Sequence, residues 1–189
     1  MRFIFIYFLF YSSMVFAECN KLYEYGFWSA NLQISDIENK LKNVDLNILC
    51  EGRSPLHLAV LFGNKAHVEF LISKGADVSI KEENEGNTSL HWAMSNTDPK
   101  LQAEIVMVLL MNGADANARN NNQDTPLHKV YPQGKVESVR NLILAGADPF
   151  AIGHLGKTPL DKLCEYKNPC GNLYFSEGSP TFEIFKPKE

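Results

Sequence analysis

Ser54-Pro55-Leu56-His57 returns three times further along this chain of 189 residues. The later copies follow at intervals of 34, 37 and 33 residues: Thr88-Ser89-Leu90-His91, Thr125-Pro126-Leu127-His128 and Thr158-Pro159-Leu160-Asp161. A second landmark alternates with the first in fixed order: Gly75-Ala76-Asp77, Gly113-Ala114-Asp115 and Gly146-Ala147-Asp148. Two landmarks that recur together at nearly constant spacing indicate an array of structural repeats.

The residues between the two landmarks predict a pair of helices in each repeat. In the first repeat, Ser54 is placed to cap a helix that begins at Pro55. Gly63-Asn64 then breaks the chain before a second helix, predicted from Ala66 to Ser73. Gly75 follows that helix, at a place where a residue in the left-handed conformation commonly ends one.

The pattern resembles the ankyrin repeat, whose signature T-P-L-H-x-A continues here as Leu58-Ala59 and Trp92-Ala93. The resemblance implies an all-α solenoid of stacked helix-turn-helix units with projecting β-turns, with about three full repeats between divergent caps. The expected segments are an N-terminal cap over 18–47, three repeats over 48–151, a C-terminal cap over 152–170 and an aromatic-containing tail over 171–189. The tail either packs across the last repeat or docks on a partner.

Two repeats depart from the common pattern. The second repeat is four residues longer between its landmarks than the first, and the polar stretch 95–100 predicts a longer loop between its helices. Such a loop either belongs to a binding face or is tolerated drift. The third repeat has Gln123 where the other turns have glycine, which predicts a strained turn. Pro132 predicts an early end to the first helix of that repeat.

The first residues predict export. Arg2 precedes an apolar run from Phe3 to Tyr11, and Ala17 stands where a signal peptidase would cut before Glu18. The alternative is an uncleaved anchor, but the run is shorter than the roughly 20 apolar residues of a membrane span and is followed by two serines. The acidic residue before Cys19 argues against a lipoprotein. We therefore expect a signal peptide over 1–17 and a periplasmic or secreted protein without a stable membrane anchor.

All four cysteines lie in the part that remains after cleavage, and an even number in an exported chain favours disulfides. Three pairings are possible. Asn168-Pro169 forms a turn signal between Cys164 and Cys170, which favours a bridge between these two. The remaining pair is Cys19 with Cys50, whose separation is close to one repeat, so that adjacent units would be tied by on the order of 3 kcal/mol. The alternatives are a zinc site, for which the spacing is wrong, and free cysteines if the signal peptide is absent.

The charge balance and the motifs of the chain argue against several classes of function. The chain carries 18 basic and 22 acidic residues without a basic stripe, and cleavage would remove one basic residue and no acid. That balance disfavours nucleic acid as a partner. Five histidines raise the possibility of catalysis or a metal site, but the resemblance gives His57, His91 and His128 a structural role in their turns. No catalytic or nucleotide-binding motif is present. We expect no catalytic residue, no metal and no cofactor.

The resemblance implies that a concave face, made from turn tips and first helices, binds another protein. The matching positions are Glu51, Arg53, Leu61 and Phe62 in the first repeat, Asn84, Glu85, Asn87, Ser95 and Asn96 in the second, Asn121, Asn122, Asp124 and Gln133 in the third, and His154, Leu155, Lys157 and Tyr166 in the C-terminal cap. Phe62 offers an apolar anchor, and the asparagines offer adaptable hydrogen bonds for a polar or basic partner. The alternative is that these residues only form solvated turns and bind no partner.

The sequence thus predicts a monomeric, exported, non-catalytic protein that binds, inhibits or scaffolds a protein partner. Two other functions remain open: a secreted effector that engages a host protein, and an enzyme whose site has no recognisable motif. A structural role in a constitutive complex would be distinguished by fixed stoichiometry.

Overall fold

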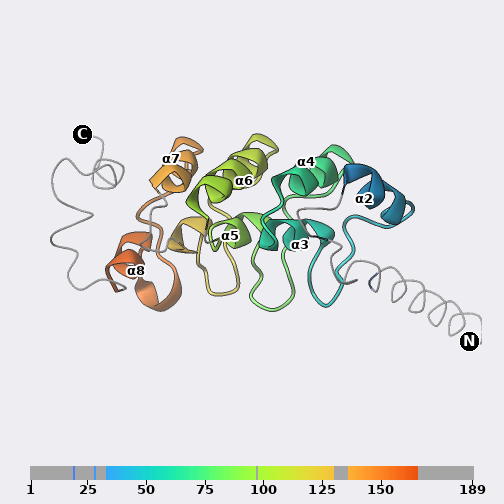
Figure 1. Cartoon of the computed structure of the whole chain (residues 1–189). Coiled ribbons are helices and arrows are strands. Elements are labelled where there is room, and N and C mark those ends of the chain that lie inside the picture. The colour runs from blue at the N-terminus through green and yellow to red at the C-terminus, as the bar shows by residue number, and fades with distance from the viewer. Residues whose placement is uncertain (1–18, 20–27, 29–32, 97, 130–135, 166–189) are drawn as a thin grey trace, which may run out of the picture.

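The computed structural model describes Cys19, Trp28 and residues 33–96, 98–129 and 136–165. Within these ranges every regular element is a helix (Figure 1). Two isolated antiparallel bridges, Cys50 with Arg53 and Lys81 with Thr88, close turns between helix pairs. In chain order the described helices are α2 (Ile34–Lys40), α3 (Pro55–Leu61), α4 (Lys65–Ser73), α5 (Ser89–Ala93), α6 (Pro99–Met111), the 3₁₀ helix η1 (Pro126–Lys129), α7 (Val136–Leu144), the 3₁₀ helix η2 (His154–Gly156) and α8 (Pro159–Glu165).

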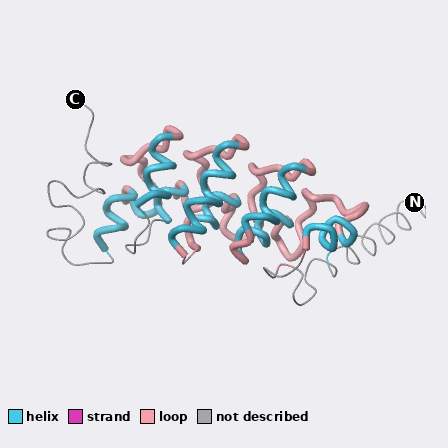
Figure 2. Tube along the Cα trace, turned by 45° about the horizontal axis from the view of Figure 1, so that its top comes forward, coloured by secondary structure: helices cyan, strands magenta, loops and turns pink. Residues whose placement is uncertain are grey.

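The helices form two layers that run the length of the array (Figures 1 and 2). One layer contains α2, α4, α6 and α7, and the other contains α3, α5, η1 and α8. Within a repeat α3 packs on α4 and α5 packs on α6, while α3 contacts α5 and α4 contacts α6 between repeats. This arrangement confirms the predicted helical solenoid, since each unit contacts its neighbours in sequence.

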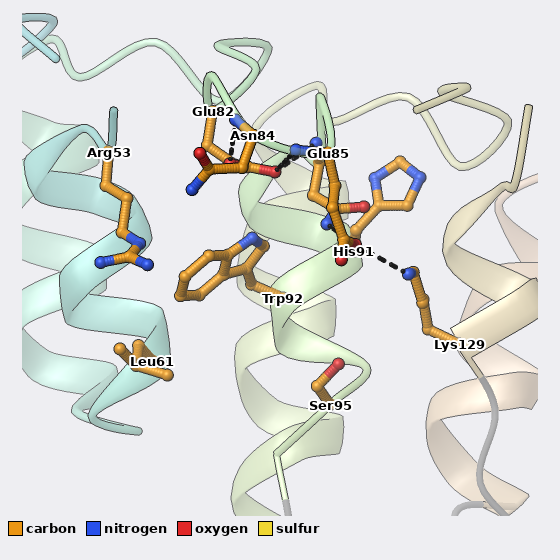
Figure 3. A pocket seen from close by; sticks show the side chains of 10 residues that line it. Arg53, Leu61, Glu82, Asn84, Glu85, His91, Trp92, Ser95 and Lys129 are labelled. Carbon is orange, nitrogen blue, oxygen red and sulfur yellow. Dashed lines mark hydrogen bonds and ion pairs between the residues drawn. The ribbon is translucent and has the colours of Figure 1, made fainter. Parts of the chain in front are cut away.

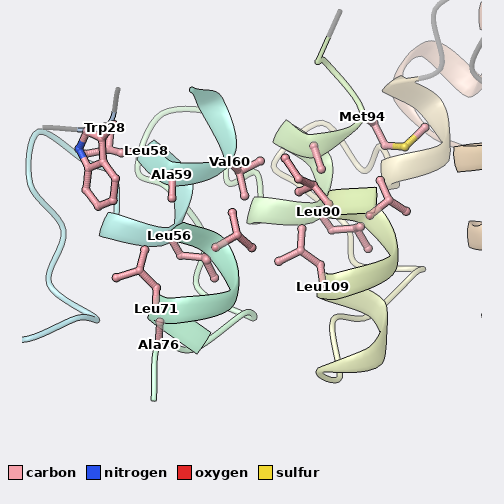
Figure 4. Packing of buried hydrophobic residues seen from close by; sticks show 14 of the residues in the cluster. Trp28, Leu56, Leu58, Ala59, Val60, Leu71, Ala76, Leu90, Met94 and Leu109 are labelled. Atoms are coloured by element: carbon pink, nitrogen blue, oxygen red, sulfur yellow. The ribbon is translucent and has the colours of Figure 1, made fainter. Parts of the chain in front are cut away.

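The core is a row of interfaces between neighbouring repeats. Leu56 and Leu71 of the first repeat are fully buried, as are Leu90 and Leu109 of the second (Figure 4). Burying a side chain of this size contributes roughly 1.5–3 kcal/mol. A single repeat cannot cover both sides of its own helices, so the repeats fold against one another or not at all.

The start of α3 and the residue that follows α4 are as the sequence predicts. The Ser54 hydroxyl accepts a hydrogen bond from the His57 N–H at 3.4 Å, and Pro55 occupies the first turn of α3. Asn64 caps α4 by accepting from the His67 N–H at 3.2 Å. Gly75 follows α4 with φ of 95°, a conformation that glycine adopts without steric cost.

The extra length of the second repeat lies in its loop as well as in a helix, so the predicted longer loop is present but accounts for only part of it. Five residues separate α5 from α6, whereas three separate α3 from α4. α6 has 13 residues, whereas α4, its counterpart in the first repeat, has 9. Asp98 caps α6 by accepting from the N–H groups of Lys100 and Leu101, and Pro99 is its first residue. The polar stretch 95–100 therefore contains part of the longer loop and the start of a longer helix.

The turn of the third repeat is strained, as predicted. Gln123 has φ of 62°, in the left-handed region that the equivalent Gly86 occupies at 68°. A residue with a Cβ atom has a steric penalty there that glycine does not. The first helix of this repeat is the single 3₁₀ turn η1, which ends at Lys129. Pro132 lies outside the described residues.

The N-terminal cap is joined to the first repeat by a disulfide. Cys19 is bonded to Cys50, with the two Cα atoms 5.2 Å apart. α2 contributes Ile37 to the core, and Trp28 is also buried. The side chain of Cys164 and all of Cys170 lie outside the described residues, so their pairing stays a prediction.

The C-terminal cap keeps the first three residues of the motif that begins a helix, but its fourth residue is aspartate and not histidine. Asp161 stands in the position of the motif histidine and accepts from both the N–H and the hydroxyl of Thr158, at 2.8 Å each.

None of the described helices is long and apolar enough to span a bilayer. The predicted signal peptide over 1–17, residues 20–27 and 29–32 of the predicted N-terminal cap and the tail over 171–189 lie outside the described residues.

Candidate partner-binding face

The turn tips and the layer formed by α3, α5 and η1 lie on one side of the array (Figure 1). We call this side the concave face. It carries a groove of about 400 Å³ that residues from three successive repeats line (Figure 3). The lining residues are Arg53, Leu61, Glu82, Asn84, Glu85, Asn87, His91, Trp92, Ser95 and Lys129. The structure thus brings together six of the residues predicted from sequence: Arg53, Leu61, Asn84, Glu85, Asn87 and Ser95.

Trp92 forms the floor of the groove and is not among the binding residues predicted from sequence. The Arg53 guanidinium carbon lies 5.3 Å from the Trp92 ring centroid, within the range of a cation–π contact. His57 meets the same ring edge-on at 5.9 Å between centroids. Trp92 and Lys129 each follow a motif histidine directly, so the variable position of the repeat signature is the signal that could have identified both.

Glu82 shapes the turn above the groove. Its buried carboxylate accepts three backbone hydrogen bonds, from the N–H groups of Asn84 (2.8 Å), Glu85 (2.8 Å) and Asn87 (3.1 Å). These bonds fix the backbone of the turn, so the side chains of Asn84 and Glu85 are presented from a rigid frame. Sequence reasoning missed Glu82 because nothing in its spacing distinguishes it from the exposed acids that follow it.

Glu85 and Lys129 form the wall opposite Arg53 (Figure 3). The Lys129 Nζ lies 3.3 Å from the Glu85 carboxylate, and the Asn87 amide donates to the same carboxylate at 2.9 Å. The hydrogen bond from Asn87, followed by the charge of Lys129, lowers the pKa of Glu85. This wall is therefore a paired acid and base, and its net charge is zero.

Asn87 and Asp124, both predicted to bind a partner, use their side chains for bonds within the repeat array. Both are buried. Asn87 accepts from the Asn120 amide at 2.8 Å, and Asp124 accepts from the His154 N–H at 2.9 Å and pairs with Lys162. Burial alone would raise the pKa of Asp124, but these two partners lower it. Both residues immediately precede a helix cap, where the side chain turns towards the next repeat.

The other predicted residues lie around the groove or away from it. Glu51 is exposed at its turn tip, Phe62 is exposed after α3, and Asn96 is half-buried with its carbonyl accepting from Gln102. Asn121 and Asn122 are exposed, and Asn121 bonds across to the preceding turn, its N–H to Glu85 and its amide to Asn84.

The predicted residues of the C-terminal cap are away from the groove. His154 and Leu155 are exposed, and the half-buried Lys157 uses its carbonyl to accept from His128 at 3.1 Å. The groove is lined by residues of the three repeats alone. Gln133 and Tyr166 lie outside the described residues.

The motif histidines join each repeat to the next. In His57, Nδ1 accepts from the Ser54 N–H and Nε2 donates to the Asn87 carbonyl of the following repeat at 3.0 Å. The same pair of bonds recurs when His91 reaches Asp124 at 3.0 Å and when His128 reaches Lys157 at 3.1 Å. Burial lowers the pKa of all three imidazoles, that of His91 to about 4. These rings are neutral, fully bonded structural groups, as the resemblance implied.

The described residues contain no group of three histidine, cysteine, aspartate or glutamate side chains arranged to hold a metal ion. The features of the groove are instead those of a recognition surface: an aromatic floor, a guanidinium stacked on it, a paired acid and base, and rigid turns. The structure therefore defines the chain as a helical repeat protein with a groove across adjacent units.

Comparison with known proteins identifies the kind of repeat. A family model described as ankyrin repeats (3 copies) matches residues 27–120. A putative ankyrin repeat protein of fowlpox virus, FPV223, is 32% identical over 128 residues, covering 67% of this chain and 86% of the viral protein. This chain belongs to the ankyrin-repeat family, and its repeats indicate a protein–protein interaction module.

Other relatives are longer than this chain. A second putative ankyrin repeat protein of fowlpox virus, FPV031, is 34% identical over 128 residues, which are 64% of this chain and 36% of the viral protein. The B-cell lymphoma 3 protein homolog of Mus musculus is 32% identical over 119 residues, 62% of this chain and 26% of the mouse protein. The chain thus matches only about a third or a quarter of these two proteins.

Proposed function

We propose that this chain is exported and binds a protein partner through its concave face, acting as an inhibitor or scaffold without catalysis. The observation that supports the proposal is the groove, because three repeats contribute to it and its floor is a half-buried tryptophan. Aromatic and arginine side chains of this kind carry much of the energy at protein interfaces. A solenoid supplies such a face without needing a partner to order it first.

Export rests on the sequence of residues 1–17, and the bond between Cys19 and Cys50 is compatible with it. Disulfides persist in the periplasm and outside the cell, whereas the cytosol keeps most thiols reduced. Sequencing the N-terminus of the protein isolated from its source tests this part directly. We expect Glu18 as the first residue, and an intact residue 1 would contradict export by a cleaved signal.

Affinity capture tests the binding function. The tagged protein is cross-linked in its native compartment and compared with a Leu61→Ser/Phe62→Ser double variant. These side chains are 51% and 61% exposed, so their replacement removes apolar surface from the concave face without opening the core. We expect the partner to be recovered with the parent protein and lost with the variant.

The matched control is Met107→Ser/Met111→Ser in α6, on the other helix layer. Those side chains are 47% and 80% exposed, so a comparable apolar area is removed away from the groove. Equal recovery by the two double variants would move the interface off the concave face. Recovery at a fixed stoichiometry under all conditions would favour a structural complex over an inhibitor.

A further inference from the structure

The side chain of Arg53 is the feature of the groove that the repeat architecture leaves unexplained. Arg53 occupies the position immediately before a helix cap, as Asn87 and Asp124 do in the next two repeats. In those repeats the side chain is bonded to the following unit, to Asn120 in one case and to Lys162 in the other. The Arg53 Nε is buried without a hydrogen-bond partner, and no ion pair joins its guanidinium to a carboxylate of the described residues.

The backbone holds Arg53 in place firmly. Its N–H donates to the Cys50 carbonyl and its carbonyl accepts from the Cys50 N–H, both at 2.9 Å. Cys50 is in turn bonded to Cys19. The guanidinium lies over the ring of Trp92, with its carbon 5.3 Å from the ring centroid. A flexible, charged side chain is thus partly desolvated and ordered before any partner arrives.

Among hydrogen-bond acceptors, a carboxylate stabilises a partly desolvated, unpaired guanidinium the most. The fork of N–H donors matches the two oxygens of a carboxylate in geometry and charge, and the bond is stronger where water is excluded. The two acids that line the groove are already committed, since Glu82 accepts three backbone N–H groups and Glu85 is paired with Lys129. Neither acid that lines the groove is therefore available to the guanidinium.

We propose that the groove binds an acidic side chain of the partner, an aspartate or a glutamate, at the Arg53 guanidinium above Trp92. This inference rests on the proposed function and names the chemistry of the partner. The apolar side of the pocket is Leu61, which is half exposed beside the same groove (Figure 3). The segment recognised is then an acidic residue with an apolar neighbour. A polyanion is disfavoured because the chain itself carries a net charge of −4.

This partner differs from the polar or basic one that the asparagine-rich turns suggest from sequence. The difference arises because the exposed asparagines partly bond to one another's turns, whereas the cation has no acceptor among the described side chains. Asn121, for example, donates its amide to the Asn84 carbonyl at 3.2 Å.

Selection from a library of random peptides tests the proposal while the natural partner is still unidentified. The probe is a phage-displayed library selected on the disulfide-bonded protein. The strongest binder and a twin with its acid replaced by the amide (Asp→Asn or Glu→Gln) are then synthesised and titrated by calorimetry. We expect the selected peptides to share an acidic residue next to an apolar one.

Arg53→Met supplies the test of the contact. We expect the acidic peptide to bind this variant at least about tenfold more weakly than the parent, as loss of a charge-assisted bidentate contact implies. The amide twin should bind parent and variant equally, since the carboxylate and the guanidinium act together. Lys100→Met is the matched control, because it removes one exposed positive charge outside the groove and should leave the affinity unchanged.

Arg53→Lys covers the case in which Arg53→Met fails to fold. It keeps the charge but not the fork, so affinity for the acidic peptide should still fall. Peptides that bind in the groove, as judged by loss in Leu61→Ser, but that lack an acid or ignore Arg53 would overturn the acidic ligand and leave the proposed function standing. Failure to select any groove-binding peptide also counts against the acidic ligand, and affinity capture then judges the proposed function independently.

Discussion

Ser89 is the residue at which this chain departs most clearly from its own repeats. It occupies the first position of α5, where the other three copies of the motif have proline. Its hydroxyl is buried and finds no hydrogen-bond partner within the described part of the chain. A buried hydroxyl that gives up water without a new partner costs about 1–3 kcal/mol. The Ser89 hydroxyl therefore lowers the free energy of unfolding, and a substitution that removes it should raise that free energy.

We predict that Ser89→Pro stabilises the protein by about 1 kcal/mol or more. Proline restricts the backbone of the unfolded chain and is preorganised for the first turn of a helix. The preceding Thr88 has φ of −83° and ψ of 168°, the extended conformation that a following proline requires. Urea unfolding measures the change in the free energy of unfolding.

Ser89→Ala separates the two contributions. It removes the unpaired hydroxyl but leaves the backbone entropy of the unfolded chain nearly unchanged, so we expect a gain smaller than that of proline. A loss of stability in the proline variant would show that the helix start in this repeat differs from the starts in its neighbours.

Helix starts and ends could be predicted from the sequence because the decisive contacts are local. Ser54 and Asn64 cap the helices that follow them, and the residue type and spacing alone identify such caps. Asp98-Pro99 is the same kind of signal, since an acid followed by proline is typical of a helix start. The polar residues on either side of it favour a loop instead, and that competing signal explains why the longer loop was predicted but the longer helix was not.

Which residues of a turn are buried and which are exposed could not be predicted in the same way. Asn87 and Asn84 are the same residue type in one turn, yet Asn87 is buried and Asn84 is exposed. The difference arises from Asn120 of the next repeat, which donates to Asn87. Such a contact depends on the register between repeats, and a residue pattern within one repeat does not contain it.

Gln102 makes a contact of this kind between helices of two neighbouring repeats. It is fully buried in α6, where its amide donates to the carbonyl oxygens of Met94 (2.8 Å) and Asn96 (3.3 Å). Its side-chain oxygen accepts from the hydroxyl of Ser138 in α7 at 2.8 Å. One side chain therefore fastens the loop before α6 and links α6 to the next repeat.

We predict that Gln102→Ala lowers the free energy of unfolding by about 2–3 kcal/mol, because it leaves buried polar groups with fewer partners and opens a cavity. Ser138→Ala alone should cost about 1 kcal/mol. The double variant should lose less than the two single losses together, since both remove one shared hydrogen bond. Strictly additive losses in urea unfolding would contradict the link between α6 and α7.

At the scale of the whole molecule, the motif histidines decide how the repeats depend on one another. Each imidazole holds its own helix cap through Nδ1 and the next repeat through Nε2. The series changes at the C-terminal cap, where the Asp161 carboxylate bonds to Thr158 of its own unit. The Asp161 carboxylate can serve the local cap but, unlike a histidine, has no donor for a following carbonyl.

The histidines also make the stack sensitive to acid. The folded protein holds His91 at a pKa of about 4, below its ordinary value near 6.5, because burial disfavours the charged ring. The unfolded chain therefore binds a proton more readily than the folded one between these values. The stabilisation is complete above pH 6.5 and is lost as the pH falls towards 4.

We predict that the free energy of unfolding falls by about 3 kcal/mol between pH 7 and pH 4 through His91 alone. His57 and His128 add to the fall in the same direction, since burial lowers their pKa values as well. Urea unfolding along this pH range measures the total. His91→Gln should give a less stable protein with a shallower pH dependence, because the titrating ring is gone. A pH profile as steep as that of the parent would instead place the acid sensitivity elsewhere. The coupling of the second repeat to the third would then not depend on a neutral imidazole.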